Sequence, residues 1–296
     1  MRTAFIKQLV REARENDKIF LIVGDLGFSV VEPFADEFPD RFLNAGIAEQ
    51  NMAGIAAGLA MEGYNVFIYS IANFPTLRCM EQIRNDICYH NLNVKIVAVG
   101  AGFSYGSLGP SHHATEELGM LRVLPNLAIL TPADPMEAIV LTKLLSNTIG
   151  PAYLRLGKAG EKQIHPDELS FGWGEIIEVI SGEHTAVACN GSIIHYCYNH
   201  IQDNRLAWGL YSIPFIKPVS DRALLDVFLR YERIISIEEH QKTGGLGSML
   251  LEHANRFRNK GDLASIPMID IRGVDNLFYS NAGSQEFLRK QMGVSL

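Results

Sequence analysis

Glu49 is a carboxylate that stands where it could do chemistry. It follows Asn44-Ala45-Gly46-Ile47-Ala48, a run in which a predicted strand ends, glycine permits a tight turn and a helix begins. Open parallel sheets bind ligands beyond the carboxyl ends of their strands. By spacing alone a structural role is the commoner explanation, because a carboxylate in the first turn favours the positive end of the helix dipole.

The helix predicted after Glu49 carries very small side chains. They are Ala53, Gly54, Ala56, Ala57 and Gly58. Side chains of this size let another backbone come very close. We therefore expect this helix to pack at an interface.

The glycine-rich segment 99–117 contains two adjacent imidazoles, His112 and His113. Long glycine-rich loops at strand ends usually bind ligands. Neighbouring residues on a helix cannot both face one point, so a metal pair is not expected. Hydrogen bonding to an oxygenated or phosphorylated ligand suits the two side chains better. A surface loop with incidental histidines explains the composition equally well.

A third glycine-rich run, 238–248, also follows a predicted strand and opens a helix. It lacks the G-x-G-x-x-G spacing of a dinucleotide site, and no acidic residue follows a later strand. We interpret it as a structural turn or an interface loop.

Short β-branched runs alternate with helix-period segments along the whole chain, the pattern of parallel sheets covered by helices. The predicted fold class is α/β, with two doubly wound domains. Strands are expected at 19–24, 42–45, 65–70, 94–99, 127–131 and 152–156, and then at 176–180, 185–189, 207–212, 234–237 and 268–271.

Start signals mark the helices between these strands. Asp134 is a predicted N-cap followed by proline and, two residues later, by Glu137, and Ser220 is a second predicted N-cap. The periodicity stops between Gly157 and Gly174. This interruption predicts a linker there, with one domain at 1–165 and another at 175–296.

The composition excludes several classes of protein. With 26 basic and 33 acidic residues the net charge is −7, so neither nucleic acid nor a membrane surface is an expected partner. No stretch approaches the roughly 20 apolar residues that span a bilayer, and residues 1–11 form a helical stripe rather than a signal sequence. The four cysteines lack metal-ligand spacing and fit small core residues in a reducing cytoplasm.

Five motifs follow one another along the chain. They are Gly46-Ile-Ala-Glu-Gln-Asn-Met52, Gly109-Pro-Ser-His-His113, Thr131-Pro-Ala-Asp-Pro135, Ile216-Lys-Pro218, and Ile237-Glu-Glu-His240 with Gly244-Gly-Leu-Gly-Ser248. In this order they resemble the back portion of transketolase, and 1-deoxyxylulose-5-phosphate synthase, a relative, shares the pattern. The resemblance covers essentially the whole chain. It implies a thiamine diphosphate pyrimidine-binding domain followed by the transketolase C-terminal domain.

The resemblance also implies roles for individual residues. In the family, the glutamate that matches Glu49 hydrogen-bonds a ring nitrogen of the aminopyrimidine of thiamine diphosphate. Proton sharing there favours the imino tautomer that activates the cofactor. By the same matching, Ile71 and Phe74 line the pyrimidine pocket, and His112 faces the substrate oxygens as a catalytic residue. Asp25 resembles an acidic residue at the cofactor-facing end of the first strand.

Several positions depart from the family pattern. Lys158 stands where an arginine often meets substrate phosphate, and it keeps the charge without the bidentate fork. His113 replaces the more usual glutamine and adds a donor toward substrate. Leu108 replaces an acidic residue and Gly100 a donor-contacting histidine, which disfavours ordinary sugar-phosphate donors. Phe74 is the one ring left of an aromatic cluster.

The family's diphosphate-binding element, a Gly-Asp-Gly with a later asparagine that binds magnesium, has no match in this sequence. We therefore expect one subunit of a split transketolase. A separate N-terminal, diphosphate-binding subunit would hold most of the Mg²⁺ site, in an α2β2 assembly. The pair would transfer a two-carbon ketol unit from a ketose or ketose phosphate to an aldose.

Two alternatives stay open. One is a subunit of a decarboxylating synthase that resembles 1-deoxyxylulose-5-phosphate synthase and uses pyruvate. The other is a non-catalytic regulatory subunit of the same fold, against which the presence of Glu49 argues.

Overall fold

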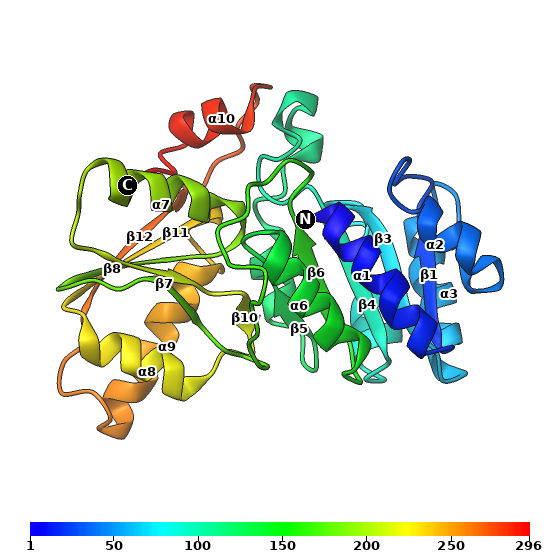
Figure 1. Cartoon of the computed structure of the whole chain (residues 1–296), viewed down its shortest axis with the longest axis horizontal. Coiled ribbons are helices and arrows are strands. Elements are labelled where there is room, and N and C mark those ends of the chain that lie inside the picture. Colours follow the sequence, from blue (N-terminus) through cyan, green and yellow to red (C-terminus); the bar gives the residue numbers. More distant parts are fainter.

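Two mainly parallel sheets organise the chain, and the computed structural model describes every residue from 1 to 296 (Figure 1). The first-half strands are β1 (Ile19–Val23), β2 (Phe42–Asn44), β3 (Asn65–Ile71), β4 (Val94–Val99), β5 (Ala128–Leu130) and β6 (Ala152–Leu156). The later strands are β7 (Ile177–Ile180), β8 (Thr185–Cys189), β9 (Gly209–Ser212), β10 (Phe215–Lys217), β11 (Arg233–Gln241) and β12 (Met268–Val274). The sheet orders are β10-β5-β6-β4-β3-β1-β2 and β12-β11-β8-β9-β7. The predicted α/β class is confirmed.

Helices connect the strands and cover the sheets. The α-helices are α1 (Arg2–Glu15), α2 (Glu32–Glu37), α3 (Glu49–Met61), α4 (Met80–Gln82), α5 (Glu117–Arg122), α6 (Pro135–Ser146), α7 (Ile194–Asp203), α8 (Asp221–Arg230), α9 (Leu246–Lys260) and α10 (Gln285–Gln291). Short 3-10 turns occupy Pro39–Arg41, Gly106–Leu108, Pro110–His112 and Gly191–Ile193, and a π-helical turn occupies Ile83–Cys88. None of these helices combines the length and the apolar character that crossing a membrane requires.

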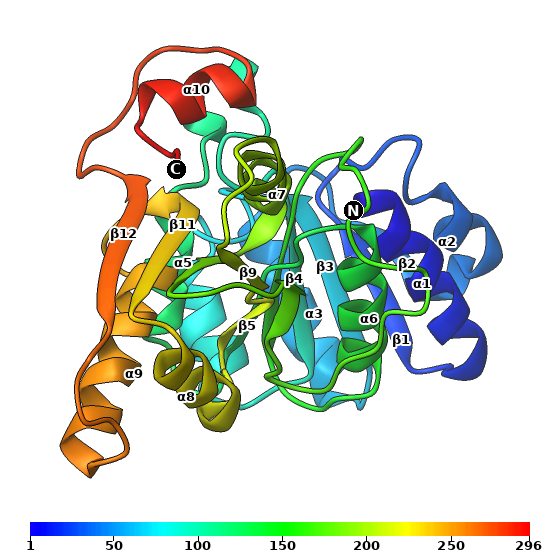
Figure 2. The ribbon, with the colours of Figure 1, turned by 60° about the vertical axis from the view of Figure 1, so that its left-hand side comes forward.

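The strands of the first sheet are buried on both faces. Leu21 and Val23 of β1 pack with α1 and α6, which lie side by side over one face of the sheet (Figure 2). Ile22, between them, packs with α3 on the other face. Because both faces are covered, these strands are continuous apolar runs in the sequence. The cluster around α3 also contains Leu246 of α9, so the two halves share one core.

The sequence pattern does not predict β10. It lies between Pro214 and Pro218, and three residues between two prolines are typical of a loop. The strand pairs antiparallel with β5 and thereby extends the first sheet. A segment of the second half therefore belongs to the first sheet, while the division at 1–165 and 175–296 stays a prediction.

The carboxyl ends of the central strands meet at one edge of the first sheet. β1 pairs in parallel with β2 and β3, and β3 and β6 pair in parallel with β4. The segments that leave these ends begin at Gly24, Ala45, Ala72, Gly100 and Gly157. Every residue to which the sequence assigns chemistry lies in or just after one of these segments, except Ile71, which is the last residue of β3.

Asp134 connects the start of α6 to the segment predicted as a linker. As predicted, it caps α6: its Oδ1 atom accepts hydrogen bonds from the backbone N–H groups of Met136 and Glu137, each at 2.9 Å. Its Oδ2 atom accepts from the backbone N–H groups of Ile164 and His165, also at 2.9 Å. Burial alone would raise the pKa of Asp134, but the hydrogen bonds from His165 and the helix start lower it to about 2.

Asp134→Asn should lower the free energy of unfolding at pH 7 by about 2 kcal/mol, because an amide cannot accept four N–H groups as a carboxylate does. An unfolded aspartate titrates near pH 4. The stabilisation from a folded pKa of about 2 is therefore complete above about pH 4 and is lost as the pH falls toward 2. Urea unfolding of both proteins across this range measures the effect.

Asp203→Asn is the matched control, because Asp203 is exposed at the end of α7. The control should change stability by less than about 0.5 kcal/mol. Equal losses in the two variants, or a difference at pH 2.5 as large as the difference at pH 7, would contradict the assigned role of Asp134.

Candidate active site

Glu49 is the first residue of α3, and its side chain is 2% exposed. The turn before it depends on Gly46, whose φ of 73° is a left-handed conformation that glycine adopts without strain. A Cβ atom at Gly24 would lie 3.6 Å from Cγ of Glu49 and 3.4 Å from Oγ of Ser70, so the carboxylate sits between the ends of β1 and β3. The Ser70 hydroxyl is buried and has no hydrogen-bond partner.

Arg78 pairs with this carboxylate, although no motif in the sequence singles it out. Its Nη1 atom donates to Oε2 of Glu49 at 2.9 Å, and the Arg78 side chain is half exposed. The guanidinium carbon also lies 5.1 Å from the centroid of the Phe74 ring. The signal that could have found Arg78 is its position four residues after Phe74, in the segment that leaves β3.

Phe74 and His112 lie side by side. Their ring centroids are 5.5 Å apart, with the planes inclined at 71°. Asn73 joins their two loops, because its Nδ2 atom donates to the backbone carbonyls of Ser111 at 3.2 Å and His113 at 2.5 Å. The contacts thus form a row that runs from Glu49 to Arg78, then to Phe74 and finally to His112.

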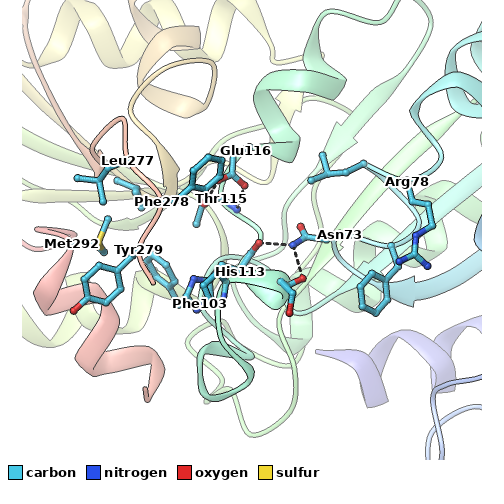
Figure 3. A pocket seen from close by; sticks show the side chains of 15 residues that line it. Asn73, Arg78, Phe103, His113, Thr115, Glu116, Leu277, Phe278, Tyr279 and Met292 are labelled. Atoms are coloured by element: carbon cyan, nitrogen blue, oxygen red, sulfur yellow. Dashed lines mark hydrogen bonds between the residues drawn. The ribbon is translucent and has the colours of Figure 1, made fainter. Parts of the chain in front are cut away.

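His113 points elsewhere. It is 6% exposed, its ring packs edge-on against Phe103 at 5.2 Å, and its Nε2 atom has no partner. Burial lowers the pKa of His113, so the imidazole is neutral at pH 7. It lines a cavity of about 570 Å³ that extends from Phe74 and Arg78 to the segment that holds Phe278 (Figure 3).

The other predicted site residues occupy separate places. Ile71 ends β3, and its carbonyl accepts from the backbone N–H of Phe74 at 2.8 Å, so the two residues share one turn. Asp25 is exposed beyond β1, and its Oδ1 atom accepts from Nδ2 of Asn44 at 3.0 Å. Lys158 is exposed and does not line the cavity next to Glu49. It lines a second hollow with Lys162, His195, Arg289 and Lys290.

Segment 238–248 joins the two halves, in agreement with its interpretation as a structural turn or interface loop. Glu238 accepts from the backbone N–H groups of Leu246 and Gly247 at the start of α9. Glu239 accepts from the backbone N–H of Phe103 at 3.0 Å, and Arg155 donates to the Glu239 carbonyl at 3.0 Å. The loop that carries the two histidines is therefore braced by the second half.

These groups fit one end of a flat, nitrogen-containing ring. Glu49 presents a carboxylate whose Oε1 atom accepts no hydrogen bond within the chain, and the Ser70 hydroxyl beside it is unpartnered. Phe74 supplies a partly exposed ring nearby. A carboxylate, a hydroxyl and an aromatic face match what an aminopyrimidine needs for hydrogen bonding and stacking. The structure groups no three His, Cys, Asp or Glu side chains that could hold a metal ion.

Comparisons with known proteins point in the same direction. Residues 1–160 match the family model described as transketolase, pyrimidine binding domain. The chain is 31% identical to an apulose-4-phosphate transketolase subunit of Actinobacillus succinogenes, over 94% of this chain and 88% of that protein. It is 33% identical to a second protein with the same name, from Phocaeicola vulgatus, over 85% of this chain and 82% of that protein.

Two further similarities concern a longer enzyme and a solved structure. The 1-deoxy-D-xylulose-5-phosphate synthase of Caldanaerobacter subterraneus is 30% identical over 85% of this chain, which spans 41% of the synthase. The structure described as a split gene transketolase, inactive beta4 tetramer, superposes with a TM-score of 0.86 at 32% identity. That match covers 99% of this chain and 93% of the solved one.

Asn73→Asp should loosen the loop that carries His112, because a carboxylate cannot donate to the carbonyls of Ser111 and His113 and repels them. We expect the backbone amides of residues 112–114 to exchange hydrogen about tenfold faster, a loss of roughly 1.4 kcal/mol of local stability. Hydrogen exchange followed by mass spectrometry measures the rates. Asn199→Asp, at an exposed position of α7, is the control and should leave them unchanged.

Proposed function

The chain belongs to the transketolase family, and we propose that it is the pyrimidine-binding half of a two-chain transketolase that works only with a partner subunit. The observation that carries this proposal is the buried Glu49 carboxylate, held at the start of α3 beside the Phe74 turn. Such an enzyme transfers a two-carbon ketol unit from a ketose or ketose phosphate to an aldose. Pyrimidine domains of this family imply dependence on thiamine diphosphate.

The need for a partner is supported by the relatives. Two curated relatives of nearly the same length are each described as one subunit of a transketolase. The similar solved structure is described as an inactive tetramer of beta chains, which fits a subunit that lacks part of its active site. We assign the cofactor diphosphate and Mg²⁺ to the partner, since the longer synthase is more than twice the span that this chain matches.

Glu49 is the proposed catalytic acid. When bound, thiamine diphosphate supplies a nucleophilic carbon that attacks a ketose carbonyl and stabilises the negative charge left by carbon–carbon cleavage. Glu49 would hold and share a proton with the pyrimidine ring nitrogen, the exchange that general acid–base catalysis requires. Ile71 and Phe74 would line the ring's pocket from one turn, and Asp25 would stand at the nearby end of β1.

His112 is proposed to orient substrate oxygens. Its ring lies against Phe74 at the mouth of the site, so it can address a substrate beside the pyrimidine ring. His113 would reach a substrate only through the cavity that it lines, as a neutral imidazole. Lys158 is proposed to meet a substrate phosphate from its separate hollow, which holds Lys162, Arg289 and Lys290 together with the carboxylates of Glu161 and Glu286.

The proposed assembly is α2β2. Gly54 and Gly58 face solvent on α3, and Ile47, just before Glu49, is 78% exposed. Small exposed residues beside an exposed apolar one form a surface that another subunit can cover closely.

The four cysteines are buried and unpaired, which fits a reducing compartment such as the cytoplasm.

A decarboxylating synthase is the second candidate. Gly100 has a φ of 101°, and a Cβ atom there would clash with the ring of Tyr105, so a side chain that contacts the donor cannot stand at this position without movement. Leu108 is 55% exposed and offers no polar group. Both features favour a donor with fewer hydroxyl groups, such as pyruvate.

Glu49→Gln in the reconstituted two-chain enzyme should lower turnover by a factor of about 10² to 10⁴, the usual contribution of a general acid or base. The amide keeps the shape but cannot exchange the proton. A coupled assay of ketose-dependent transfer measures the loss. Unchanged turnover would favour a non-catalytic regulatory subunit, in which Glu49 has no chemical role.

Donor consumption by the same pair separates the two enzymes. We expect transfer from ketoses without carbon dioxide release, measured by product analysis with a ketose, pyruvate or both as donor. Carbon dioxide released from pyruvate at a comparable rate would support the synthase and contradict the transketolase assignment. The chain without its partner should show neither activity.

A further inference from the structure

Arg78 is the one cation that contacts Glu49. Its Nη1 atom donates to Oε2 of Glu49 at 2.9 Å, and the exposed fractions of the two side chains are 50% and 2%. One member of the pair is therefore withdrawn from water while the other stays accessible from the cavity. A buried carboxylate needs such a partner, because its lost hydration is otherwise uncompensated.

Two further polar groups near the carboxylate, Ser70 and Cys79, are neutral. Ser70 contributes an unpartnered hydroxyl beside Gly24. Burial and the nearby Glu49 charge raise the pKa of the Cys79 thiol to about 12, so the thiol stays protonated at pH 7. Neither group can replace the charge of Arg78.

The guanidinium is held from a second side by Phe74, with 5.1 Å between its carbon and the ring centroid. The turn that carries both residues is closed by local hydrogen bonds. The backbone N–H of Leu77 donates to the Asn73 carbonyl at 3.1 Å, and the Cys79 thiol donates to the Phe74 carbonyl at 3.4 Å. Arg78 thus connects the predicted acid to the predicted ring-stacking residue.

We propose that Arg78 is a positioning residue that holds Oε2 of Glu49 and leaves Oε1 available to the ring nitrogen of the aminopyrimidine. This inference rests on the proposed function. Oε1 accepts no hydrogen bond within the chain, so it is the free oxygen of the Glu49 carboxylate. The hydrogen bond from Arg78 fixes the orientation of the carboxylate, so Oε1 is the oxygen that can meet the ring nitrogen.

The test is a double-mutant cycle in the reconstituted complex, with thiamine diphosphate and Mg²⁺ as the probe. Calorimetry should show about tenfold weaker cofactor binding for Arg78→Met, the loss expected for one charge-assisted hydrogen bond. In the Glu49→Gln background the same substitution should change binding by less than about twofold, since the partner charge is gone. Turnover at saturating cofactor should also fall, while KM for the ketose stays within about twofold.

Two variants control for folding and for general charge. Arg78→Lys keeps the charge but loses the planar guanidinium, so it should recover part of the binding and also carries the test if Arg78→Met misfolds. Arg84→Met removes an exposed arginine that pairs only with Asn85, and it should bind the cofactor as the unmodified complex does.

An equal loss in both Glu49 backgrounds would mean that Arg78 acts through the general fold, and the inference would be wrong. Binding by Arg78→Met that equals that of the Arg84→Met control would also overturn it. Failure of the unmodified complex to bind thiamine diphosphate is a different result, because it would reject the proposed function itself.

Discussion

Withdrawal of one carboxylate from water is the constraint on which the candidate site depends. Glu49 stands at the start of a helix that packs into the core, so its charge must be compensated by something nearby. Arg78 does this from the segment that leaves β3. The two meet because β1, β2 and β3 run in parallel, which brings the segments after their carboxyl ends to one edge of the sheet. The parallel direction of these strands therefore brings Glu49 and Arg78 together.

The second half of the chain supports this edge although it supplies none of the residues in the row from Glu49 to His112. Arg155 is fully buried, forms an ion pair with Glu117, and donates to the carbonyls of Ala114 and Glu239. The Glu239 side chain in turn accepts from the backbone of Phe103. The loop that carries both histidines is thus fixed between the halves. A buried network of this kind is costly to leave half satisfied, so the halves are expected to fold as one unit.

Much of the fold follows from local rules, whereas the key contact of the site does not. β4, β6 and β8 begin and end at the predicted residues, and Asp134 and Ser220 cap their helices, because periodicity and capping depend on neighbours in the sequence. The small residues of α3 are expected to let another backbone approach at an interface, but Ala53, Ala56 and Ala57 are buried in the chain's own core, and only Gly54 and Gly58 face solvent. Arg78 was missed because its partner is 29 residues away and the two meet only in the folded sheet.

The side chains of His112 and His113 point in different directions because a 3-10 turn ends between these two residues. His112 closes the 3-10 turn that starts at Pro110, whereas His113 is extended, with φ −73° and ψ 127°. The side chains therefore diverge, one toward Phe74 and the other toward Phe103. The cavity of about 570 Å³ that His113 lines is formed by residues of both halves and includes Phe74 and Arg78. A ligand that fills it would therefore touch two residues of the row that starts at Glu49. The geometry of a single turn thus places one histidine beside Phe74 and the other beside Phe103, at the cavity that both halves of the chain line.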